Sequence, residues 1–358
     1  MIQGYNIKLA RDSRGIVQKE LAEMLSINQG TLSRYEKGMI DIPDDILPKL
    51  SEVLHFPQSF FVSQLQNVGS QSSLFYRKRA TFSVKSLNKL EAYVSVVSHA
   101  IDQMAASLDL PALDIPQVEP NGELLPEDIA FQVRNYFRLR KGPVENIVGL
   151  LERHGVIVVS LNIPDTEKFD GMTLFTNGGH CVIFINASFP NDRKRATLAH
   201  ELGHCVMHLR SMDLEKPEDV KEKEAKAFAG EFLLPRDQCI EEFTNMKFKD
   251  LPMLKYEWLV SKAFITYRAT SIGAITPKTE KYFYITLGRQ GERTTENELV
   301  SIDSPKILNQ MLSLFLNDLQ YSQEDLSDLM GINYKELINV TQERMTNIVS
   351  LFHVSSTK

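Results

Sequence analysis

Cysteine is scarce in this sequence, and the spacing of the few cysteines excludes the structures that they most often build. Only Cys181, Cys205 and Cys239 occur in 358 residues, and no two of them form a Cys-x-x-Cys pair. An odd and widely spaced set is neither a disulfide framework nor a thiolate zinc cluster. We therefore expect a protein of a reducing compartment, the cytoplasm.

Long apolar runs and an excess of positive charge are also missing. No stretch approaches 18 consecutive apolar residues, and the opening MIQGYNIKLARDSRG has charges where a signal peptide has its apolar region. We expect neither export nor a membrane partner. The net charge of −6 weighs against a broad phosphate-binding surface, so we expect any contact with DNA to come from a local face.

The sequence does contain a succession of helical patterns, interrupted once by strand patterns. Three short β-rich runs, GVIVVSL, GMTLF and CVIFINAS, precede two strongly helical segments. We predict a multidomain protein: an all-α bundle at 1–64, a helical linker region at 65–145, an α+β domain with a small sheet at 146–285, and a mostly helical region at 286–358. KYFYITLG, residues 281–288, is expected to form part of a short strand pair.

The N-terminal bundle contains the pattern VQKELAEMLSINQGTLSRYEKG. Its apolar positions, including Leu21, Ala22, Leu25 and Leu32, would pack two short helices across a tight turn. That geometry is typical of a helix-turn-helix, whose second helix enters the major groove of DNA. The alternative is a small bundle used for protein contacts, which is consistent with seven basic against eight acidic side chains in 1–64.

These residues resemble the XRE, or lambda-repressor-like, helix-turn-helix family over about 60 residues. Ser26 stands where the family usually has a glycine in the turn. The resemblance implies a buried ion pair between Arg11 and Glu36. It also implies DNA as a partner of residues 18–38, with contacts from Gln18 to phosphate and from Gln29, Gly30, Thr31, Ser33 and Arg34 to bases.

A second motif lies in TLAHELGHCVMH, residues 197–208. His200 and His204 are four residues apart and share one face of a helix, while Glu201 lies about 100° round it. In an H-E-x-x-H helix two neutral imidazoles bind zinc, and the carboxylate takes a proton from the attacking water. The alternative is a core helix with incidental histidines. His208 lies too far along the helix axis to reach the same ion, so we expect it to pack structurally.

A catalytic zinc site needs a third protein ligand. The segment EKEAKAFAGEFLLP begins about 20 residues after His204, so its helix can face the motif. Glu224 adjoins the apolar side and lies four residues before Phe228, so we prefer it as the ligand. Glu222 is the alternative, unless it belongs to a solvated charged face.

RKRATLAHELGHCVMH, EKEAKAFAGEFLLP and LKYEWLVSKAFITYRATSIGAIT together resemble the ImmA/IrrE family of metallopeptidases, over roughly residues 75–279. The resemblance implies a zincin-like domain at 146–285. It also implies a gluzincin-like Zn²⁺ site, in which His200, His204 and Glu224 are the ligands and Glu201 is the general base. Family members cleave cytoplasmic repressors of the XRE type.

We therefore expect a DNA-binding regulator with a zinc-dependent endopeptidase domain, whose substrate is a regulatory protein such as a partner repressor. One alternative is a repressor or antitoxin in which the peptidase fold is a non-catalytic sensor or dimerisation scaffold. Another is a peptidase whose helix-turn-helix recruits a protein and never binds DNA. The strand pattern CVIFINAS is a place where an extended substrate could add. SQEDLSDLMGINYKELINV resembles a further helix-turn-helix with few basic residues, which favours docking or homodimerisation over DNA.

Overall fold

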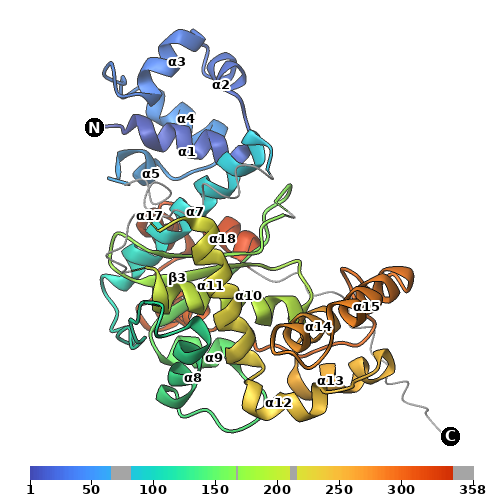
Figure 1. The fold of residues 1–358 in the computed structure, drawn as a ribbon. Coiled ribbons are helices and arrows are strands. Elements are labelled where there is room, and N and C mark those ends of the chain that lie inside the picture. The colour runs from blue at the N-terminus through green and yellow to red at the C-terminus, as the bar shows by residue number, and fades with distance from the viewer. Residues whose placement is uncertain (66–81, 167, 210–215, 342–358) are drawn as a thin grey trace, which may run out of the picture.

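The computed structural model describes residues 1–65, 82–166, 168–209 and 216–341, and it confirms the predicted fold class (Figure 1). A helical bundle lies at one end, a small sheet lies in the middle, and further helices surround the sheet. Among the described residues, no helix is long and apolar enough to cross a bilayer. The N-terminal helices are α1 (Gly4–Arg14), α2 (Gln18–Met24), α3 (Gln29–Glu36), α4 (Ile46–Leu54) and α5 (Gln58–Val62), followed by the long α7 (Val84–Ala105).

The sheet has three strands, β1 (Val156–Leu161), β2 (Gly171–Phe175) and β3 (Cys181–Asn186), in the order β1-β3-β2. β3 runs parallel to β1 and antiparallel to β2. Because β3 has a neighbour on each side, an extended substrate has no place beside it. The prediction that CVIFINAS could accept a substrate strand is therefore wrong.

Both faces of the sheet are buried, and each face belongs to a different hydrophobic core. Along β1, Ile157 and Val159 face the first core, whereas Val156 and Val158 face the second. This alternation follows from the period of two along a strand. The first core joins the N-terminal bundle, α7 and the C-terminal helices to the sheet. The N-terminal bundle and the sheet therefore share one core, and the predicted domain boundaries stay predictions.

The second core is made by the helices on the other face of the sheet. Helix α10 crosses next to β2 and β3, and α11 packs along α10 (Figure 1). The helices of this core are α8 (Pro126–Tyr136), α9 (Ile147–Arg153), α10 (Asn191–Met207), α11 (Glu218–Leu233), α12 (Arg236–Phe243), α13 (Leu251–Trp258), α14 (Lys262–Ser271) and α15 (Pro277–Arg289).

Helix α15 contradicts the strand predicted for residues 281–288. Thr276 caps the helix by accepting a hydrogen bond from the Thr279 backbone N–H, and Pro277 occupies the first turn, where proline is tolerated. Phe283 and Leu287 are the buried residues of this helix, four residues apart. The aromatic and β-branched residues of the segment indicated a strand, but the cap and the buried pair fit a helix.

The predicted C-terminal helix pair is present and packs within the chain. It follows α16 (Ile307–Ser313) and the π-helical turn η3 (Leu314–Asp318), and consists of α17 (Gln323–Met330) and α18 (Tyr334–Thr341). Arg14 of the N-terminal bundle donates to both carboxylate oxygens of Glu336 in α18, and Tyr93 of α7 donates to Glu336 at 3.1 Å. At the end of α18, Val340 accepts a backbone hydrogen bond from Asn162, just after β1. The pair therefore connects the bundle to the sheet.

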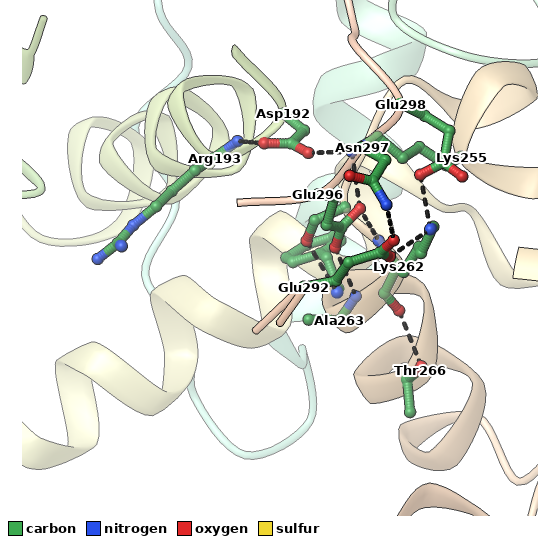
Figure 2. Close-up of polar contacts among 12 residues, drawn as sticks. Asp192, Arg193, Lys255, Lys262, Ala263, Thr266, Glu292, Glu296, Asn297 and Glu298 are labelled. Atoms are coloured by element: carbon green, nitrogen blue, oxygen red, sulfur yellow. Dashed lines mark hydrogen bonds and ion pairs between the residues drawn. The ribbon is translucent and has the colours of Figure 1, made fainter. Parts of the chain in front are cut away.

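A buried cluster of charges fixes the beginning of α10 (Figure 2). Lys255 Nζ lies 2.5 Å from Asp192 Oδ2, in the first turn of α10, and 2.7 Å from Glu296 Oε2. Lys262 Nζ lies 2.5 Å from Glu292 and 2.6 Å from Glu298. Burial alone would lower the pKa of Lys255, but hydrogen bonds to Asp192 and Glu296 raise it. The ammonium is therefore charged and links α13 and the segment after α15 to α10.

We expect Lys255→Met to lower the free energy of unfolding by about 3–5 kcal/mol, because it leaves two buried carboxylates without their cation. The fluorescence of Trp258, the only tryptophan in the chain, reports this region during urea unfolding. Lys223→Met is the control, since Lys223 and Asp219 form an exposed pair whose loss costs at most about 1 kcal/mol. Equal shifts of the urea midpoint in both variants would contradict the expectation.

Candidate metal centre and DNA-binding face

Two glycines allow α10 to approach its neighbours closely. A Cβ at Gly203 would lie 3.1 Å from the ring of Phe228 and 3.3 Å from the Cα of Ala225, both in α11. On the other side, a Cβ at Gly171 of β2 would lie 2.4 Å from Thr197 Cγ2. The motif helix is thus held tightly between a strand and a helix, and side chains from all three elements meet around it.

Three polar side chains converge where α10 faces α11. His200 Nε2 lies 3.1 Å from His204 Nε2. The two carboxylate oxygens of Glu222 lie 3.4 Å from His200 Nε2 and 3.8 Å from His204 Nε2. The side chain of His204 is 3% exposed, that of His200 24% and that of Glu222 19%. The cluster is therefore reached from solvent past His200 and Glu222.

The third member of this cluster is Glu222 and not the preferred candidate, Glu224. Glu224 instead accepts a hydrogen bond from His208 at 2.9 Å and pairs with Lys216 at 2.6 Å. The preference for Glu224 rested on the apolar stripe of α11, which indicates the buried side but not which flank of that stripe faces His200 and His204. The geometry corrects the candidate ligand set to His200, His204 and Glu222.

The donor set of this cluster fits zinc. Two imidazole nitrogens and one carboxylate are typical ligands of a catalytic zinc site, which leaves a fourth position open. Bonds of about 2.0–2.1 Å at tetrahedral angles place neighbouring donors about 3.3 Å apart. The observed separations of 3.1, 3.4 and 3.8 Å lie around that value.

Glu201 extends from a different side of α10, toward β2. Its Oε2 accepts a hydrogen bond of 2.7 Å from Thr173 Oγ1, and the residue is 3% exposed. This position is consistent with the rotation of about 100° between neighbouring helix residues. Sequence reasoning missed Thr173, because a threonine in a strand pattern looks like any other β-branched strand residue.

His208 lies in direct contact with the candidate ligand His204, which the expectation of a packing role had not anticipated. Its Nδ1 is 2.9 Å from His204 Nδ1, and its Nε2 is 2.9 Å from Glu224 Oε2. Burial lowers the pKa of His208, and the hydrogen bond to Glu224 opposes that effect. Cys205 points elsewhere, with its Sγ 3.7 Å from Cys181 Sγ of β3.

The residues predicted to contact bases all lie in α3. Asn28 caps the helix by accepting a hydrogen bond of 2.7 Å from the Gly30 backbone N–H. Leu32 and Tyr35 are buried, which turns the rest of the helix outward. Gln29, Gly30 and Arg34 are exposed, and Thr31 and Ser33 are half-buried. This arrangement supports a recognition helix, and the individual base contacts stay predictions.

The turn before α3 and the ion pair behind it have the expected form. Ser26 has a φ of 55°, the left-handed conformation that explains why a glycine is usual there. Arg11 donates to both oxygens of the buried Glu36, at 2.6 and 3.1 Å. The side-chain amide of Gln18 also donates to Glu36, at 2.7 Å, so the ion pair positions the residue predicted to contact phosphate.

We expect Gly171→Ala to destabilise the protein by about 1–3 kcal/mol, because the added Cβ collides with Thr197 and lies 3.2 Å from Oε1 of Glu201. Thermal unfolding followed by circular dichroism measures the change. Gly288→Ala is the matched control: it lies within α15 with nothing within 4 Å of the added Cβ, and alanine there gains helix propensity. A Gly171→Ala protein as stable as Gly288→Ala would refute the close contact.

Two family models match the chain, and both agree with the geometry. Residues 7–57 match a model described as helix-turn-helix. Residues 151–270, which contain the sheet, α10, α11 and the His200, His204 and Glu222 cluster, match a peptidase model described as IrrE N-terminal-like domain. A comparison with curated proteins finds no match. The chain is therefore similar to an XRE-type helix-turn-helix over residues 7–57 and to an ImmA/IrrE metallopeptidase-type domain over residues 151–270, as the motifs predicted.

Proposed function

We propose that this protein is a cytoplasmic DNA-binding regulator whose peptidase domain uses zinc to hydrolyse a peptide bond in a regulatory protein, such as a partner repressor. The observation that carries the proposal is the convergence of His200, His204 and Glu222, whose ligand atoms lie within 4.8 Å of one another. The family matches support a DNA-binding module and a peptidase-type domain in the same chain.

In this proposal His200, His204 and Glu222 hold the zinc ion. Zinc, when bound, polarises the scissile carbonyl and lowers the pKa of a water molecule toward about 7. Glu201 takes a proton from the attacking water, whose oxygen bonds to the carbonyl carbon. As the carbon–nitrogen bond breaks, Glu201 passes the proton to the leaving amine. Thr173 orients the carboxylate through its 2.7 Å hydrogen bond.

The helix-turn-helix adds the regulatory part of the proposal. Gln29 and Arg34 are exposed on α3 and are suited to adenine and guanine edges in the major groove. The bundle has no excess of positive charge, so we propose that its affinity comes from base contacts and from a second copy of the chain more than from phosphate neutralisation.

Glu201→Gln is expected to keep about one zinc per chain and to slow cleavage by about 10²–10⁴-fold, because it removes the base but no ligand. Glu222→Ala is expected to lose most of the zinc, because it removes a ligand. Elemental analysis measures the metal. Mass spectrometry of cells that co-express each form with proteins from neighbouring genes measures the cleavage.

Glu218→Ala is the matched control for the metal measurement, since Glu218 begins the same helix but pairs with Lys221. It should bind as much zinc as the unaltered protein. A Glu201→Gln protein that cleaves its partner normally would exclude the proposed base. Partner proteins that stay intact with every form, while DNA binding persists, would favour the non-catalytic regulator.

We expect Arg34→Ala to weaken binding to the duplex upstream of the protein's own gene by about 10- to 100-fold, because one base contact contributes about 1–3 kcal/mol. Fluorescence anisotropy with a labelled duplex measures the affinity at fixed salt. Arg289→Ala removes another exposed arginine, on α15, and should have no effect. Equal affinity of all three forms would favour a helix-turn-helix that recruits protein.

A further inference from the structure

A chain of hydrogen bonds leads away from the candidate ligand His204. His204 Nδ1 lies 2.9 Å from His208 Nδ1, and His208 Nε2 lies 2.9 Å from Glu224 Oε2. The other oxygen of Glu224 lies 2.6 Å from the Lys216 ammonium. The side chains of His204 and His208 are 3% and 5% exposed. Two side chains, His208 and Glu224, thus connect the Lys216 ammonium to the ring of the buried candidate ligand His204.

The order of donors and acceptors in this chain determines which nitrogen of His204 carries the proton. An ionised carboxylate only accepts hydrogen bonds. The Nε2 of His208 must therefore carry a hydrogen and donate a hydrogen bond to Glu224. In a neutral imidazole the other nitrogen is then an acceptor. His208 Nδ1 therefore accepts from the Nδ1–H of His204, which leaves the Nε2 of His204 unprotonated.

That unprotonated nitrogen is the one that faces the other two candidate ligands. His204 Nε2 lies 3.1 Å from His200 Nε2 and 3.8 Å from Glu222. A histidine ligand binds metal through an unprotonated ring nitrogen, and a partner on its other nitrogen fixes both the tautomer and the ring plane. In this protein the partner is a second imidazole that is itself fixed by a carboxylate.

We propose that Glu224 and His208 are positioning residues, which hold His204 in the Nδ1–H tautomer with its Nε2 lone pair turned toward His200 and Glu222. This inference rests on the proposed metal site and gives Glu224 a role other than ligand. The hydrogen bonds select one tautomer of each imidazole, that is, which of its two nitrogens carries the proton. They do not change the number of protons that the chain holds. Lys216 supports the chain by pairing with the other oxygen of Glu224, which holds the carboxylate in place.

The first test measures zinc affinity of the full-length protein by competition with a chromophoric chelator. We expect His208→Leu and Glu224→Ala each to weaken zinc binding by about 10- to 100-fold, as the loss of a residue that orients a metal-binding histidine does at other zinc sites. We expect His208→Gln to recover part of the loss, because its amide oxygen can accept the Nδ1–H of His204. His154→Leu is the control: it breaks a similar pair, His154 with Asp114 at 2.9 Å, in another part of the chain, and should leave zinc affinity unchanged.

The second test reads the tautomer without metal. Nitrogen–proton correlation spectra of zinc-free protein labelled at its eight histidines should show His204 protonated at Nδ1. In the His208→Leu variant, His204 should shift toward a mixture of tautomers. The circular dichroism spectrum of the variant should match that of the unaltered protein. A merely packed His208 would change stability but not the tautomer.

The outcomes separate this inference from the proposed function. Unaltered protein with His204 protonated at Nε2, or unchanged zinc affinity in both His208→Leu and Glu224→Ala, overturns the positioning role. Unaltered protein that binds no zinc but shows the Nδ1–H tautomer overturns the metal site and supports the hydrogen-bond chain.

Discussion

The close packing of α10 between β2 and α11 is the constraint on which the candidate site depends. A Cβ at Gly171 of β2 would collide with Thr197 at 2.4 Å, and a Cβ at Gly203 of α10 would press on Phe228 at 3.1 Å. With the helix held there, a spacing of four residues places His200, His204 and His208 in one row, and Glu201 falls on the side of β2. One helix therefore supplies two of the three candidate ligands and the candidate base, and α11 adds Glu222.

The sheet places that helix opposite the helix-turn-helix bundle. α10 packs in the core on one face of the sheet, while α1 to α5 and α7 belong to the core on the other face. Glu336 of α18, held by Arg14 and Tyr93, adds a polar connection between the bundle and the C-terminal helices. Because packed interiors deform little, the bundle and the peptidase-type domain are linked by shared side-chain packing as well as by the chain.

The features that the sequence predicted well are those set by local periodicity. The spacing of His200 and His204 implies a shared helix face, and the apolar positions of α2 and α3 imply the helix-turn-helix. Each of these predictions depends only on the pattern of one helix or of two consecutive helices. The features it did not predict depend on contacts between distant segments. The middle position of β3 is decided by pairing with both β1 and β2, and Thr173 meets Glu201 only after the sheet has formed.

The choice between Glu222 and Glu224 shows where periodicity stops being informative. Residues two apart in a helix differ by about 200°, so these two carboxylates flank the apolar stripe of α11 on opposite sides. The stripe itself, with Ala225 and Phe228 buried, is the same whichever carboxylate is the ligand. What separates them is how α11 lies along α10: Glu222 meets His200 and His204, and Glu224 meets the next histidine in the row. Both carboxylates therefore serve the same row of imidazoles, one at the candidate metal cluster and the other one helical turn further along.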